Sequence, residues 1–165
     1  MAKDSSFDVV SEVDLQEVDN AYQQTRKELV QRYDLKDSKA TLDFDKSAKN
    51  FTLTAPSEFV ASQVRDVLNT KLVHRKIDLK SLKWSDPQAA SGMMVRSTGQ
   101  IIEGIEKETA SKINKDIKAE KFKVKVQIEG EKLRVFSASR DALQEVIAFL
   151  KEQDYGLPLQ FNNYR

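Results

Sequence analysis

Apolar and polar residues alternate along the chain with two periods, and segments with the two periods follow one another in a regular order. A period of two residues is typical of a half-buried strand, and a period of 3.6 residues is typical of an amphipathic helix. The first half of the chain gives the order strand, helix, strand, strand, helix, strand. These six segments span residues 7–13, 15–33, 41–45, 50–54, 56–72 and 77–84.

The same order starts again in the second half. Its six segments span residues 93–98, 101–118, 122–129, 132–136, 139–150 and 159–164. The apolar patterns of the two halves superpose with almost no identical residues, which favours a duplicated architecture. Each half is therefore predicted to be a two-layer α+β sandwich, in which two helices cover one face of a sheet and leave the other face open.

The charge balance and the lack of cysteine exclude several classes of protein. The chain carries 27 Lys and Arg against 26 Asp and Glu, so any attraction to a polyanion must be local. Without Cys there are no disulfides, thiolate metal sites or Cys nucleophiles, which fits a reducing cytosol. No apolar run approaches the ~18–20 residues of a membrane span, and the first residues hold no signal-peptide stretch. The sequence thus predicts a cytoplasmic protein with no membrane partner.

No set of residues supports an enzymatic function. The one histidine, His74, has cationic neighbours, and we interpret it as a surface residue. Asp43 and Asp45 beside Lys46 are typical of a polar outer face. The segment Gly99–Gly104 has the glycine spacing of a phosphate-binding loop but lacks the Lys-Ser/Thr that would hold the phosphates. We therefore predict no catalytic residues, no cofactor and no metal.

The strands predicted at 122–129 and 132–136 sort basic and apolar residues onto opposite faces. The apolar set must face the helices, so the basic set is expected on the open face. The residues expected together there are Lys121, Lys123, Lys125, Lys132, Arg134 and Phe136. Phosphates pair with Lys and Arg while a base stacks on an aromatic ring, so this face is predicted to bind a nucleotide or single-stranded RNA.

Two alternatives to this site stay open. The charged residues of the two strands could simply solvate the outer face of the sheet. If the basic face is not the site, the groove between the halves or the region near Arg165 is the next place to look. The octapeptide signature of RNA recognition motifs is absent at 50–54 and at 132–136, and the latter keeps one aromatic residue. Any RNA would therefore bind without the usual pair of stacking rings.

Motifs at both ends of the chain carry a resemblance to a known family. The N-terminal motif is Ser-Phe-Asp-Val-Val-Ser-Glu-Val-Asp-Leu-Gln-Glu-Val at 6–18, and the C-terminal motif is Pro-Leu-Gln-Phe-Asn-Asn-Tyr-Arg at 158–165. Shorter matches lie between them, at 38–40, 71–72, 104–106 and 139–144. Over its whole length the chain resembles the bacterial YajQ family.

The resemblance implies a tandem of ferredoxin-like βαββαβ domains, similar to RNA recognition motif domains, whose N-terminal strands are exchanged. It also implies a small cytosolic nucleotide-binding protein. The ligands proposed across the family are RNA, purine nucleotides and, in some members, a cyclic dinucleotide. Leu159 stands where an aromatic residue often precedes Gln160, which removes one candidate stacking ring. The family supplies no catalytic residues.

The charge pattern gives a separate reason to expect exchanged strands. In its own half, strand 7–13 would place Asp8 and Glu12 on the sheet face that carries Asp43 and Asp45. Like charges side by side on a sheet are unfavourable by up to about 1 kcal/mol a pair. After exchange, the neighbours of opposite charge would be Lys123, Lys132 and Arg134 for the first pair and Arg96 for the second.

Exchange would divide the chain into two domains. The first would span residues 14–100, including strand 91–98, and the second would combine residues 1–13 with 101–165. The stretch 85–92 is rich in Pro, Gly and Ser and poor in large apolar residues, so it is predicted to be a linker.

We therefore predict a non-enzymatic protein that binds RNA or a purine nucleotide through a basic open sheet face. The alternative is a regulatory module that binds a protein partner through an open face or a sheet edge, a contact that a cyclic dinucleotide could switch. Asp8 and Glu12 would partly neutralise the basic face, so we expect a modest affinity and a short footprint.

Overall fold

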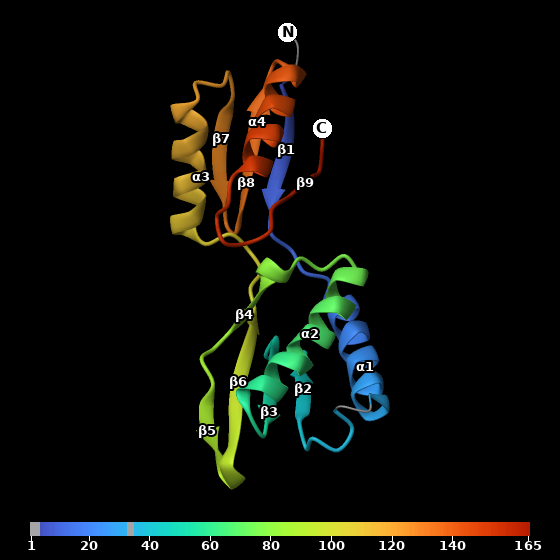
Figure 1. Cartoon of the computed structure of the whole chain (residues 1–165). Helices are drawn as coiled ribbons and strands as arrows, with labels where there is room; N and C mark the ends of the chain where they lie inside the picture. Colours follow the sequence, from blue (N-terminus) through green and yellow to red (C-terminus); the bar gives the residue numbers. More distant parts are fainter. Residues whose placement is uncertain (1–3, 33–34) are drawn as a thin grey trace. The chain divides into compact units, whose positions relative to one another are not determined.

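The computed structural model describes residues 4–32 and 35–165, which form two compact units (Figure 1). Unit 1 combines the described residues up to Glu12 with Glu103–Arg165, and unit 2 consists of the described residues of Val13–Ile102. The predicted end of the first helix at Tyr33 lies outside the described residues. Within the described ranges, no helix is both long and apolar enough to cross a membrane.

Unit 1 is an α+β sandwich with a four-stranded antiparallel sheet. Its elements are β1 (Ser5–Val10), α3 (Lys107–Ala119), β7 (Lys125–Glu129), β8 (Lys132–Ser137), α4 (Arg140–Glu152) and β9 (Gln160–Asn162). The strand order is β7-β8-β1-β9. This βαββαβ sequence with the first strand between the third and the fourth is the ferredoxin-like arrangement.

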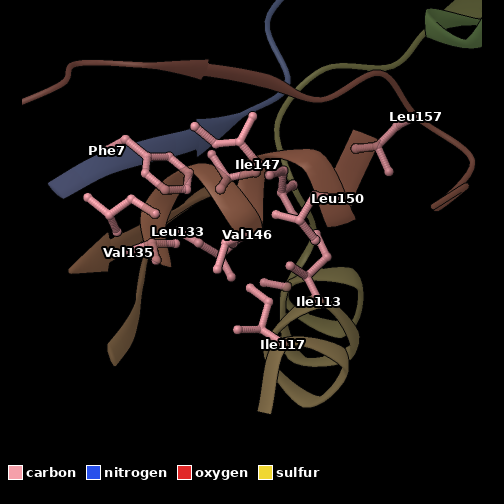
Figure 2. Packing of buried hydrophobic residues seen from close by; sticks show 13 residues of the cluster. Phe7, Ile113, Ile117, Leu133, Val135, Val146, Ile147, Leu150 and Leu157 are labelled. Carbon is pink, nitrogen blue, oxygen red and sulfur yellow. The ribbon is translucent and has the colours of Figure 1, made fainter. Parts of the chain in front are cut away.

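The core of unit 1 lies between this sheet and its two helices (Figure 2). Phe7 of β1 and Val135 of β8 lie opposite each other, and both are fully buried. Ile113 of α3 and Val146 of α4 are fully buried against them from the helix layer. Successive side chains of a strand point to opposite faces of the sheet. The strand residues next to Phe7 and Val135 in sequence therefore point to the face that the helices leave open.

Unit 2 has the same layers. Its helices are α1 (Leu15–Gln31) and α2 (Glu58–His74), and its strands are β2 (Thr41–Asp45), β3 (Asn50–Ala55), β4 (Leu82–Trp84), β5 (Gln88–Ala90) and β6 (Met94–Ile101). The sheet has the order β2-β3-β6-β4, with β5 paired to β6. Asp14 caps α1 by accepting hydrogen bonds from the backbone amides of Gln16 and Glu17, and Ser57 caps α2 in the same way.

The two strands that open the repeated pattern are β1, which pairs with strands distant in the sequence, and β6, which pairs with strands of the first half of the chain. β1 is antiparallel to β8, with Asp8 opposite Arg134, and also to β9. β6 lies between β3 and β4 in unit 2, with Arg96 opposite Thr54. The central strand of unit 1, β1, therefore comes from the start of the chain, before both helices of unit 2. The central strand of unit 2, β6, follows those helices and precedes the helices of unit 1.

Three predicted segments begin several residues later than the sequence pattern indicates. The strand predicted at 77–84 begins at Leu82, because Leu79–Ser81 forms a short 3-10 helix. The helix predicted at 101–118 begins at Lys107, because Ile101 is the last residue of β6. The run of isoleucines at 101, 102 and 105 fits both periods, so periodicity alone could not find the boundary. The strand predicted at 122–129 begins at Lys125, because the chain first has to leave the end of α3.

The linker predicted at 85–92 is wrong. Gln88–Ala90 forms β5 and pairs with β6 of the same unit. Gly92 has a φ of 73°, and Met93 follows with a φ of 62°, so the chain reverses within two residues. The small and polar residues of this stretch thus form a hairpin of unit 2.

Candidate functional site

The structure separates the six predicted site residues into three groups. Lys121 lies just after α3, with a φ of 57° and its backbone amide bonded to the carbonyl of Lys118. A residue in this left-handed conformation ends the helix, so Lys121 belongs to a helix cap and not to a strand. Its expected place on the sheet face is therefore wrong.

A second group surrounds Asp8, which is only 3% exposed. Arg134 Nε donates to Asp8 Oδ1 at 2.9 Å, and Lys132 Nζ lies 3.3 Å from Oδ2. Asn163 Nδ2 also donates to Oδ2, at 2.9 Å. A further ion pair joins Arg134 to Glu129 at 3.8 Å. Two of the predicted phosphate-binding cations are thus paired with protein carboxylates.

These contacts change the pKa of the buried carboxyl. Burial by itself raises the pKa of Asp8, but hydrogen bonds from Arg134, Asn163 and Lys132 outweigh it and hold the pKa below the ordinary value of 3.8. The carboxyl of Asp8 is therefore ionised at neutral pH. Its charge offsets part of the positive charge of the open face.

The third group forms a groove on unit 1, which we call the basic groove. Lys123, Lys125 and Phe136 line it together with Asp4, Phe122, Val124, Ser137 and Ala138. Its volume is about 380 Å³. Lys123 and Lys125 are exposed, and neither has an ion pair among the described residues.

Backbone contacts fix the shape of the basic groove. Lys125 lies directly opposite Phe136 in the pairing of β7 with β8. Ser137 is buried, and its hydroxyl donates to the carbonyl of Lys123 at 2.8 Å while accepting from the amide of Ser139 at 3.0 Å. The segment that carries Lys123 is therefore tied to β8 although it precedes β7. The backbone positions of Lys123, Lys125 and Phe136 are thus fixed relative to one another, and all three residues line the basic groove.

The open face of unit 2 has a different chemistry. Its exposed positions on β2, β3 and β6 are mostly Thr and Asn, with Asp43, Asp45 and Arg96 as the charged residues. Arg96 lies on β6, separated from the two aspartates on β2 by β3, and no ion pair joins them among the described residues. The predicted pairing of Arg96 with these aspartates is therefore wrong.

The one histidine belongs to unit 2 and lines a pocket there with Glu17, Lys71 and Arg75. His74 is exposed, as predicted for a surface histidine. Arg75 beside it is paired with Glu17 at 3.1 Å. Among the described residues, no three or more His, Cys, Asp or Glu side chains are grouped so that they could hold a metal ion.

Sequence reasoning named the region near Arg165 only as an alternative site, and it missed the contacts of Asn163 and Tyr164. Asn163 binds Asp8, and Tyr164 and Arg165 lie beside β1. Their positions follow from a backbone irregularity after β9, which no period in the sequence reports. The closing motif at 158–165 was visible as a motif, but its contacts with β1 were not.

The fold places the chain among tandem ferredoxin-like α+β proteins. The family described as "Nucleotide-binding protein YajQ-like" matches residues 5–165. A nucleotide-binding protein of Endomicrobium trichonymphae is 43% identical over the full length of both chains, and one of Bacillus cereus is 46% identical over the full length of both. One of Magnetococcus marinus is 49% identical over 97% of this chain and 98% of its own. The chain belongs to the YajQ-like family of nucleotide-binding proteins.

Proposed function

We propose that unit 1 binds single-stranded RNA or a purine nucleotide in the basic groove. The observation that carries the proposal is the meeting of Lys123, Lys125 and the ring of Phe136 in one concave surface. Ammonium groups suit phosphate oxygens, and an aromatic ring suits the flat face of a base. The names of the relatives support a nucleotide as the ligand.

The charges around the groove set the expected strength of binding. Lys132 and Arg134 are paired with Asp8, and Asp4 lines the groove. Lys123 and Lys125, which have no ion pair among the described residues, therefore remain for phosphate contacts. Because Phe122 packs against Phe149, the ring of Phe136 remains for stacking. A larger ring system covers more of Phe136, so purines are expected to bind better than pyrimidines. The affinity is expected to be modest and to fall as salt rises.

Replacing Phe136 by Leu tests the stacking contact. We expect the affinity for a short single-stranded RNA to fall at least fivefold, because a stacked base contributes about 1–3 kcal/mol. Leu keeps an apolar side chain on β8, so the melting temperature serves as the check on folding. Phe59→Leu is the matched control, since Phe59 is 73% exposed on α2 of unit 2. Equal binding by the Phe136 variant and the wild type would contradict a stacking role.

A titration with several ligands distinguishes nucleotide binding from the alternative, a module that binds a protein partner. RNA, ATP, GTP and a cyclic dinucleotide are each titrated at several salt concentrations. Binding that weakens steeply with salt is expected, because phosphate contacts release counterions. If none of these ligands binds while a protein partner binds independently of salt, the regulatory module that binds proteins replaces the present proposal.

We propose further that the protein binds its ligand in the cytosol without converting it. The names of the relatives describe nucleotide binding. We expect ATP, GTP and RNA to be recovered unchanged after long incubation with the purified protein, as measured by chromatography. Turnover that a single substitution in the chain abolishes would contradict this.

A further inference from the structure

A second cavity of unit 1 lies at the sheet edge beside β1, and we call it the edge cavity. Its volume is about 350 Å³. Its lining includes Ser6, Leu143, Gln144, Tyr164 and two arginines, Arg140 and Arg165. Its lining residues differ from those of the basic groove, and among the described residues no Asp or Glu side chain lines it.

A β-bulge after β9 shapes the edge cavity. Asn162 lies opposite Asp8, and Arg165 exchanges two backbone hydrogen bonds with Ser6, at 3.0 and 3.1 Å. From Asn162 to Arg165 the chain advances three residues, while the opposite stretch of β1, from Asp8 to Ser6, advances two. The extra residue forms a β-bulge at Asn163, whose φ is 56°. The bulge directs Asn163 to Asp8 on the open face.

The same bulge leaves the next residue, Tyr164, on the core side of the sheet edge. The ring of Tyr164 lies 6.2 Å from the ring of Phe7, centroid to centroid. Its inner side is therefore held by the core, while the residue as a whole is 60% exposed. A bulge that turns an aromatic ring toward a cavity provides a fixed stacking surface there.

The wall opposite the tail is the first turn of α4. Arg140 and Gln144 are four residues apart, so they lie on the same side of the helix, and both line the edge cavity. Leu143 is buried between them and gives an apolar floor. Among the described residues, no ion pair holds the guanidinium of Arg140 or of Arg165.

One row on the open face of the sheet runs from the basic groove to Arg165 at the sheet edge, and Tyr164 and α4 lie round that edge on the core side. Lys125 lies opposite Phe136, Phe136 opposite Ser6, and Ser6 opposite Arg165. Directly opposite residues of antiparallel strands project from the same face. The row thus runs from a lysine past an aromatic ring to an arginine, over three strand spacings of about 4.8 Å each.

We propose that the edge cavity binds a second nucleotide of a single-stranded ligand whose first nucleotide occupies the basic groove. A guanidinium binds phosphate oxygens in a bidentate manner, the ring of Tyr164 offers a stacking face, and Gln144 offers an amide for a base edge. The preferred ligand is then an oligonucleotide long enough to span three strand spacings, not a free mononucleotide or a dinucleotide. This inference rests on the proposed function of the basic groove.

The test compares ligands of increasing length. AMP and oligoadenylates of two, four and six nucleotides are titrated against the wild type and against Arg140→Gln and Tyr164→Ala. We expect the wild type to bind the tetranucleotide about tenfold or more tightly than AMP, which corresponds to one added charge-assisted contact. Both variants should lose this gain and keep the affinity for AMP. For Arg140→Gln the slope of the logarithm of the affinity against the logarithm of the salt concentration should become smaller by about 0.7, the value for one phosphate of a single strand.

Control variants separate recognition from folding and from net charge. Lys151→Gln removes one charge from the other end of α4 and should keep the full gain with length. Tyr164→Phe retains the ring and should behave like the wild type. If AMP binds but the variants keep the gain with length, or the wild type shows none, the inference about the edge cavity is wrong while the basic groove stands. If the wild type binds none of the four probes, both proposals fail.

Discussion

Replacing Asp8 by Asn should lower the free energy of unfolding by about 2–4 kcal/mol, because it breaks a buried ion pair from one side. The variant leaves Arg134 and Lys132 without their carboxylate and places a second amide against that of Asn163. Arg134 and Lys132 keep some access to water, with side chains 19% and 38% exposed, so the loss should stay below that of a fully buried pair. Urea denaturation at neutral pH measures it.

The difference in stability between the wild type and Asp8→Asn should depend on pH. The pKa of Asp8 is lower in the folded protein than the ordinary value of 3.8, so its ionised form stabilises the fold. That stabilisation is fully present above the ordinary pKa and is lost as the pH falls through the folded value. The gap in stability between the wild type and Asp8→Asn should therefore narrow below about pH 4.

The control for Asp8 is Asp43→Asn. Asp43 is exposed on the open face of unit 2, and no ion pair involves it among the described residues. This variant should match the wild type in stability at neutral pH. A wild-type stability for Asp8→Asn, or a gap that does not change with pH, would show that the buried contacts do not stabilise unit 1.

Reversing the charge of Lys123 and Lys125 should have the largest effect on binding. We expect the double variant Lys123→Glu with Lys125→Glu to bind a single-stranded RNA about 100-fold more weakly at low salt, because two phosphate contacts become repulsions. The slope of the logarithm of the affinity against the logarithm of the salt concentration should also become smaller by about 1.4, the value for two phosphates of a single strand. Fluorescence anisotropy with a labelled RNA measures both quantities.

A matched variant separates contact from net charge. Lys115→Glu with Lys118→Glu changes the charge by the same amount on exposed positions of α3, in the same unit. We expect this pair to weaken binding only slightly. If both double variants weaken binding equally, the groove is not a specific site. If the groove variant binds like the wild type, the ligand binds elsewhere.

The fold was predictable from the sequence where a period was unambiguous. The alternation at Thr41–Asp45 and at Asn50–Ala55 gives the hairpin almost to the residue. The acidic residues of the first strand also predicted a basic neighbour, and Asp8 lies opposite Arg134. Periodicity failed where apolar residues cluster, as at Ile101 and Ile105, which are buried in the cores of different units.

The candidate site was predictable only in part, for reasons of geometry. Alternation correctly placed Lys125 and Phe136 on the side away from the core. It could not show that Lys121 ends a helix in a left-handed conformation. Nor could it show the bulge that turns Tyr164 away from Asn163, because a bulge is one extra residue in a pairing and leaves no period of its own.

Mapping a bound RNA by NMR tests directly whether the binding site lies on unit 1. An isotope-labelled sample of the full chain is titrated with a single-stranded RNA of six nucleotides, and the backbone amide shifts are followed. Binding in unit 1 predicts the largest shifts around Lys123, Lys125 and Phe136, and around Arg140 and Arg165, with little change on the open face of unit 2. Shifts confined to β2, β3 and β6 of unit 2, or no shifts at saturating RNA, would contradict it.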